Sequence, residues 1–226
     1  MITCTVLTIL YVCSLYLTGG DGDRDDPVVI KHRLVGVVIS TVMAVFVSGI
    51  QSTSLSLGSH LYGFVWGLAV TLAVYSFGLF RMRLRGTVDN FKVESWGNAR
   101  NLIIGPVSEE VVFRGCFGRI LESSGYSRFV TVLIATMLFW LAHVHHFWGQ
   151  FSLSKNRARA LISIAAQSAY TAVFSIIAFL LYYKSGSLLA CLSAHMTCNA
   201  LQIPQFKSSQ EFVICSVVAV LVFILG

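Results

Sequence analysis

"LYGFVWGLAVTLAVYSFGLF", residues 61–80, runs for twenty positions without a charged side chain. An α-helix of about 20 apolar residues spans the hydrocarbon core of a bilayer. Such a helix satisfies its backbone N–H and C=O groups within itself, which lipid requires because it offers no hydrogen-bonding partner. The stretch therefore predicts a transmembrane helix.

Seven further apolar runs accompany this one. They are Ile2–Leu17, Leu34–Ile50, Leu102–Leu121, Phe129–Trp148, Ala160–Tyr183, Leu188–Ile203 and Phe212–Leu225. The chain is 56% hydrophobic and 12% charged, about half the charged fraction of a typical soluble domain. Strand-like alternation over segments of about ten residues, which would indicate a β-barrel, is absent from the sequence. We therefore predict an all-α, polytopic membrane protein of about eight transmembrane helices in a single membrane-embedded domain, residues 1–226.

The first run, Ile2–Leu17, has two interpretations. A secretory signal peptide would begin with basic residues and end at a cleavage site of the small-x-small kind. Neither feature is clear in this sequence. We expect a first transmembrane helix, with the signal peptide as the alternative.

Loop charge predicts the orientation, because cytosolic loops carry an excess of Lys and Arg. If the loop after residues 61–80 is cytosolic, twelve basic residues share its side: Arg24, Lys31, Arg33, Arg81, Arg83, Arg85, Lys92, Arg100, Lys155, Arg157, Arg159 and Lys207. Only Arg128 and Lys184 lie in the opposite loops. The N-terminus is then outside the cell or in a lumen. The net charge of +6 reflects this topology, and without a basic stripe among aromatic residues no nucleic-acid partner is expected.

Polar side chains inside membrane runs are costly, so each is a functional candidate. Glu109 and Glu110 lie in the first two turns of a run that starts at the cytosolic side. His143 lies near the cytosolic end of the next run, and His195 and Asn199 lie in the cytosolic half of the seventh. Three helices separated in sequence are thus expected to bring carboxylate, imidazole and amide to one depth.

Helical spacing suggests different roles for the two acids. Glu110 and Arg114 are four residues apart with the acid first, the favourable order for an ion pair along one helix face. Glu109 points about 100° away, on the face of Phe113 and Cys116. Glu109 is therefore the carboxylate expected to remain available for chemistry.

Each motif also has a structural interpretation. Ser108–Glu110 is typical of a capped helix N-terminus, with acids that complement the helix dipole. His143–His146 are typical of a membrane interface, next to Phe147 and Trp148. His195 and Asn199 could serve as hydrogen-bonding contacts between helices. The expected convergence of all three at one depth favours a site.

A carboxylate and a neutral imidazole can share a water molecule and remove its proton. A histidine and an asparagine on successive turns can donate hydrogen bonds to a developing oxyanion. The set predicts hydrolysis of a carbonyl compound, with metal ligation by Glu109, His143 and His195 as a competing hypothesis. No HExxH spacing supports a metal site, and the six cysteines form no CxxC pair. A cysteine hydrolase that uses Cys198, three residues after His195, is a further alternative.

Three boxes carry a family resemblance. They are "EEVVFR" (residues 109–114), "FWLAH" (139–143) and "HMTCN" (195–199). In order, they resemble the EExxxR, FxxxH and HxxxN boxes of the type II CAAX prenyl proteases, the Ras-converting endopeptidases of the ABI group. The flanking "AHVHH", "QSAYTAVF" and "SAHMTCNALQIP" resemble the eukaryotic prenyl-protein branch. The resemblance covers residues 96–204.

The resemblance implies eight transmembrane helices around a cavity open to the cytosol. It implies an endopeptidase that removes the last three residues of isoprenylated CAAX proteins. The site residues carry over by position: Glu109 and His143 activate water, and His195 and Asn199 stabilise the oxyanion.

By the same resemblance, Glu110 and Arg114 support this site from within the first box. It implies an endoplasmic reticulum membrane protein that needs no metal or cofactor. Its partners would be the lipid bilayer and farnesylated or geranylgeranylated CAAX proteins such as Ras-like small GTPases. The alternatives are a non-catalytic scaffold of the same group, a protease for unprenylated peptides, and a transporter, although no inverted halves are evident in the sequence.

Overall fold

A computed structural model describes residues 1–19, 23, 25–50, 55–85, 93, 95–153, 156–202, 204 and 206–226. The side chains of residues 82–85, 145–150 and 152–153 fall outside this description. Several residues that entered the sequence analysis are therefore outside the described residues, wholly or in their side chains: Arg24, Arg83, Arg85, Lys92, His145, His146, Phe147, Trp148, Lys155 and Ile203.

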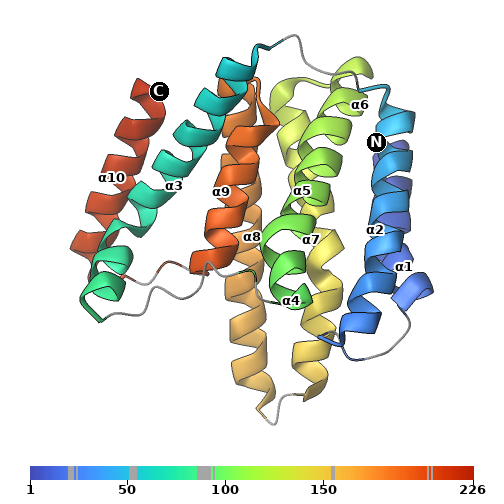
Figure 1. The fold of residues 1–226 in the computed structure, drawn as a ribbon, viewed down its shortest axis with the longest axis horizontal. Coiled ribbons are helices and arrows are strands. Elements are labelled where there is room, and N and C mark those ends of the chain that lie inside the picture. The colour runs from blue at the N-terminus through green and yellow to red at the C-terminus, as the bar shows by residue number, and fades with distance from the viewer. Residues whose placement is uncertain are drawn as a thin grey trace. The chain divides into compact units, whose positions relative to one another are not determined.

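All regular secondary structure in the described residues is helical, and these residues contain no strand. The elements are α1 (Ile2–Gly19), α2 (Pro27–Ser48), α3 (Leu57–Arg85), α4 (Trp96–Ala99), η1 (Arg100–Ile104), α5 (Gly105–Glu109), η2 (Glu110–Cys116), α6 (Phe117–Ser123), α7 (Arg128–Leu153), α8 (Arg157–Ser185), α9 (Leu188–Leu201) and α10 (Ser209–Leu225). The stretch from α4 to α6 is continuous, so the described residues form eight helical segments (Figure 1). The prediction of an all-α membrane protein is confirmed.

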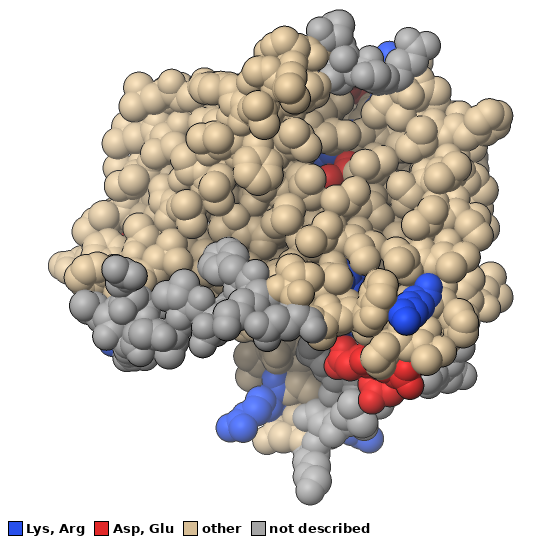
Figure 2. All heavy atoms as spheres, viewed as in Figure 1, with Lys and Arg blue, Asp and Glu red and all other residues tan. Residues whose placement is uncertain are grey.

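Four helices are long and apolar enough to cross a membrane: α1, α2, the Leu57–Arg81 part of α3, and α8. Shorter apolar helices lie at Arg128–Val144, Leu188–Leu201 and Ser209–Leu225. Many large apolar side chains on these helices are exposed, such as Phe46 at 86%. Figure 2 shows one face on which uncharged residues form most of the described surface. Such a surface suits lipid contact better than water.

The chain divides into two compact units that alternate along the sequence. The first consists of Met1–Gln51 and Val111–Leu180, and the second of Ser52–Glu110 and Leu181–Gly226. The boundary between Glu110 and Val111 falls inside the "EEVVFR" box, at the start of η2. The single domain over residues 1–226 stays a prediction.

In the first unit, α1 packs against α2 and α7. The approach of α1 and α2 is close, because a β-carbon at Gly36 would lie 2.6 Å from the carbonyl oxygen of Ser14. The sequence also defines the ends of α2. Asp26 caps the helix by accepting a hydrogen bond from the Val28 N–H, and Gly49 ends it in the left-handed conformation.

In the second unit, α3 packs against both α9 and α10, as Figure 1 shows. The contact with α9 depends on a small residue, because a β-carbon at Gly67 would overlap the carbonyl oxygen of Ala190. At the start of α3, the His60 ring nitrogen Nδ1 lies 2.9 Å from the Ser187 hydroxyl, which caps α9. Helices α3 and α9 therefore run in the same direction.

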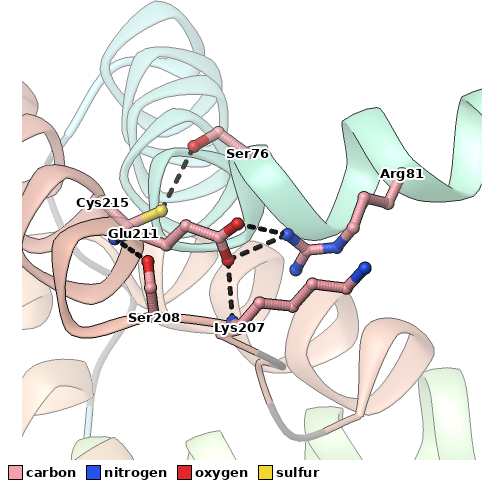
Figure 3. A network of polar contacts seen from close by, with 6 residues as sticks. All are labelled: Ser76, Arg81, Lys207, Ser208, Glu211 and Cys215. Carbon is pink, nitrogen blue, oxygen red and sulfur yellow. Dashed lines mark hydrogen bonds and ion pairs between the residues drawn. The ribbon is translucent and has the colours of Figure 1, made fainter.

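Helix α10 runs opposite to α3. Arg81 near the end of α3 donates two hydrogen bonds of 2.8 Å to the carboxylate of Glu211, in the first turn of α10. Figure 3 shows this contact, together with the Lys207 backbone N–H that donates to the same carboxylate. Ser208 caps α10 by accepting from the Glu211 N–H. Within this unit, the end of α3 and the start of α10, both of which the loop-charge argument assigns to the cytosol, lie together.

Candidate active site

The two adjacent acids lie at a change of helix type. Glu109 ends α5, and Glu110 begins the π-helix η2, which continues to Cys116. The α-helical spacing that we assumed for Glu110 and Arg114 is therefore wrong, because a π-helix closes i→i+5 hydrogen bonds and has a wider turn. The two carboxylates also differ in exposure: the Glu109 side chain is 20% exposed and that of Glu110 is 2% exposed.

His195 of α9 lies between the two carboxylates within the second unit. Its Nδ1 is 2.6 Å from Oε1 of Glu110, and its Nε2 is 3.7 Å from Oε2 of Glu109. A carboxylate oxygen only accepts hydrogen bonds, so Nδ1–H of His195 is the donor to Glu110. This contact fixes the orientation of the ring and leaves Nε2 on the side of Glu109.

Asn199 lies one turn after His195 and has a defined amide orientation. Its Nδ2 donates a 2.8 Å hydrogen bond to the backbone carbonyl of Asn101, in the π-helix η1. The Asn199 side chain is exposed. An amide NH₂ group has two protons, so a second donor direction remains for a ligand.

His143 and Arg114 belong to the first unit. Nδ1 of His143 donates a 2.8 Å hydrogen bond to the carbonyl oxygen of Phe139, four residues earlier in α7. In the neutral ring this bond makes Nε2 the nitrogen that carries the lone pair. Arg114 is completely buried, and its guanidinium lies 4.3 Å from the ring centroid of Phe139, with the rings of Phe174 and Phe179 at 5.5 and 5.8 Å.

The structure thus brings together three of the predicted site residues, Glu109, Glu110 and His195, in one unit. Asn199 lies on the same helix as His195. The convergence of His143 with these residues stays a prediction, and so does the pairing of Glu110 with Arg114.

Two partners were missed in the sequence. Glu110 was assigned to Arg114 on spacing alone, and the bond to His195 spans 85 positions, which no local rule detects. Asn101 acts through its backbone carbonyl, which carries no sequence signal at all. The contact of Glu110 with His195 could have been considered from the sequence, because two adjacent acids inside an apolar run have only one basic residue, Arg114, near them in the sequence.

The alternative chemistries can be compared with the same residues. Among the described residues, no group of three His, Cys, Asp or Glu side chains has the geometry to hold a metal ion. Cys198 is half-buried in the last turn of α9. Metal independence and the dispensability of Cys198 both stay predictions.

Comparison with known proteins gives a consistent result. A family described as type II CAAX prenyl endopeptidase Rce1-like matches residues 93–201. A probable CAAX prenyl protease 2 from Schizosaccharomyces pombe is 32% identical over 218 residues, which is 87% of this chain and 78% of that protein. The chain belongs to the type II CAAX prenyl endopeptidase family.

Other members of the type II CAAX prenyl endopeptidase family align along most of the chain. The CAAX prenyl protease 2 of Homo sapiens is 29% identical over 238 residues, covering 92% of this chain and 72% of its own. That of Caenorhabditis elegans is 27% identical over 230 residues, covering 91% and 86%. No solved structure matches the chain.

The family match includes all six predicted site residues and agrees closely with the predicted core of residues 96–204. The predicted class of enzyme, a CAAX prenyl endopeptidase in a multi-pass membrane protein, is confirmed at the level of the family. The roles of the individual residues are proposals.

Proposed function

We propose that this chain removes the last three residues of isoprenylated CAAX proteins by attack of an activated water. The observation that carries this proposal is the position of His195, 3.7 Å from Glu109 and 2.6 Å from Glu110. A general base and a hydrogen-bond donor must both reach the scissile carbonyl, one through the water and one at the oxygen. Glu109 and Nε2 of His195 lie close enough together to serve one peptide bond.

In this proposal Glu109 is the general base. It is the more exposed of the two carboxylates, so water can reach it. His143 assists by accepting a hydrogen bond from the same water at its Nε2. The proton of the neutral ring lies on Nδ1, which donates to the carbonyl of Phe139, so Nε2 carries the lone pair that accepts.

The reaction has two steps. Glu109 takes a proton as the water oxygen forms a bond to the carbonyl carbon, and the carbonyl electron pair moves onto its oxygen. Nε2–H of His195 and the Asn199 amide donate to this oxyanion. The carbonyl then re-forms, the C–N bond breaks, and the proton on Glu109 passes to the leaving nitrogen. The products are a tripeptide and a prenylcysteine carboxylic acid, which releases the second proton of the water to solvent and becomes a carboxylate.

Glu110 has a distinct task in this scheme. Nδ1–H of His195 is already donated to Glu110, so Nε2 can donate to the oxyanion only when the ring carries both protons. A charged ring that is buried needs a compensating anion, and the Glu110 carboxylate supplies it. The arrangement is the one in which an acid orients a catalytic imidazole.

We further propose that the substrates are farnesylated or geranylgeranylated CAAX proteins, including Ras-like small GTPases. The enzyme would reside in the endoplasmic reticulum membrane, as the family resemblance implies, with its site open to the cytosol, as the loop-charge distribution indicates.

The test is cleavage of a farnesylated CAAX peptide by the purified chain, with the products identified by mass. Release of the intact C-terminal tripeptide supports the proposal, and Glu109→Gln is the inactive control. No release from prenylated peptides, together with release from unprenylated ones, would contradict the substrate assignment.

A further inference from the structure

Gln202, the residue directly after α9, has an unusual backbone conformation. Its φ is 61° and its ψ is −152°, and among the described residues it is the only one other than glycine with a positive φ. This region of φ/ψ space is almost exclusive to glycine, because a β-carbon there is crowded by the backbone. A glutamine in this conformation must be held by its surroundings.

The contact that holds it comes from α3. The hydroxyl of Tyr75 donates a hydrogen bond to the backbone carbonyl of Gln202. Tyr75 is only 6% exposed, whereas the Gln202 side chain is exposed. The bond therefore depends on the Tyr75 hydroxyl and on the backbone of Gln202, and the glutamine amide is not required.

The last turn of α9 carries Asn199, and it is tied on two sides. Asn199 itself donates to the carbonyl of Asn101, and three residues later Gln202 is tied to Tyr75. Helix ends fray when nothing holds them. Fraying here would change the direction of the Asn199 amide, and a displacement of about 1 Å can cost a large factor in rate.

We propose that Tyr75 is a positioning residue: its hydroxyl holds Gln202 in this positive-φ conformation and so fixes the last turn of α9 and the Asn199 amide. This inference rests on the proposed function for its catalytic consequence. Its structural part, the order of the last turn, can be measured separately.

The first experiment compares Tyr75→Phe with the unmutated enzyme on a farnesylated CAAX peptide. We expect kcat to fall roughly tenfold with little change in KM, less than the 10²–10³ that complete loss of an oxyanion donor costs. The matched control is Tyr62→Phe, because the Tyr62 hydroxyl at the other end of α3 donates to the carbonyl of Gly226. That variant should keep the unmutated kcat.

Rescue separates the backbone conformation from other effects. In the Tyr75→Phe background, Gln202→Gly should recover most of the lost kcat, because glycine adopts the conformation without help. Gln202→Ala retains the β-carbon and should give no recovery. If Tyr75→Phe does not accumulate, Gln202→Pro tests the same point, because proline cannot reach a positive φ. It should show the same fall in kcat.

A second readout does not depend on activity. Cys198 is half-buried beside Asn199, whereas Cys191 is buried earlier in α9. The rate of Cys198 alkylation in detergent should rise several-fold in Tyr75→Phe, with no change at Cys191. If the unmutated chain cleaves no prenylated peptide, the proposed function fails. The alkylation rates still test whether the Tyr75–Gln202 hydrogen bond orders the last turn of α9. Unchanged Cys198 alkylation, or a fall in kcat that Gln202→Gly and Gln202→Ala restore equally, would overturn the positioning role.

Discussion

Oε1 of Glu110 lies 2.6 Å from Nδ1 of His195, and the two side chains are 2% and 7% exposed. Burial of a carboxylate costs free energy unless a hydrogen-bond donor compensates its charge, and the N–H of a buried imidazole needs an acceptor. Each group supplies what the other requires. The contact also joins the acids that open the first sequence box to the histidine that opens the third, within the second unit, where Glu109 lies on the other side of the same ring.

Glu109→Gln and Glu110→Gln should both reduce cleavage but to different extents. Glutamine cannot act as a base, so Glu109→Gln should remove nearly all activity and leave the melting temperature in detergent almost unchanged. Glutamine at residue 110 can still accept the His195 bond but carries no compensating charge. We expect a partial loss of about 10- to 100-fold in kcat and a lower melting temperature. Equal, complete inactivation of both variants with unchanged melting would contradict this division of roles.

Removal of either proposed oxyanion donor should lower kcat more than it changes KM. His195→Ala and Asn199→Ala should each lose about 10²–10³ in kcat, because the hydrogen bonds strengthen only as the oxyanion forms. Steady-state kinetics on a farnesylated peptide measure this. Cys198→Ser is the control from the same helix turn and should keep most activity. An inactive Cys198→Ser enzyme at normal abundance would favour a thiol mechanism.

Gly67→Ala should destabilise the second unit, because its β-carbon would overlap the carbonyl oxygen of Ala190 and force α9 away from α3. Overpacking of this kind costs about 1–3 kcal/mol. Thermal melting in detergent measures the change.

Gly78→Ala provides a matched control on the same helix, since no heavy atom outside its own neighbourhood lies within 4 Å of a β-carbon there. Its melting temperature should stay the same or rise slightly, because alanine favours a helix over glycine. Equal destabilisation by both substitutions would mean that the close approach at Gly67 has no special role.

Stability should decline in acid partly through Glu211. The Lys207 backbone N–H, followed by Arg81, holds the pKa of this carboxyl below its ordinary value of 4.5. Because the folded pKa is the lower one, the carboxylate stabilises the fold above pH 4.5. The contribution is lost as the pH falls through the folded pKa. Glu211→Gln should lower the melting temperature slightly at neutral pH and flatten its decrease below pH 4.5. Parallel curves for the two proteins would contradict this.

The orientation can be tested by cysteines introduced at exposed positions. Ser95→Cys and Asn156→Cys should react with an impermeant thiol reagent once the plasma membrane alone is opened, because both are in segments assigned to the cytosol. Ser124→Cys, in the turn after α6, should react only when the internal membrane is opened as well. The reverse pattern would invert the topology and place the site on the other side.

Features of the fold that depend on local sequence could be predicted, whereas those that depend on contacts between distant residues could not. Helices could be predicted because an uninterrupted apolar run has one solution in lipid. The π-helix from Glu110 could not, because no local rule distinguishes it from an α-helix, so the spacing on which the pairing with Arg114 was based is not the one in the structure. The conformation of Gln202 was also beyond prediction, since its cause is the Tyr75 hydroxyl 127 residues away.

The separation of Glu110 and His195 along the chain has a consequence for biogenesis. The two residues are 85 positions apart, so at about 5–20 residues per second Glu110 leaves the ribosome roughly 4–17 s before its partner. During that interval the Glu110 carboxylate, inside an apolar segment where polar side chains are costly, would lack the imidazole that compensates it in the folded chain. The pair that joins the first and third boxes can therefore form only late in biogenesis, after α9 has been synthesised.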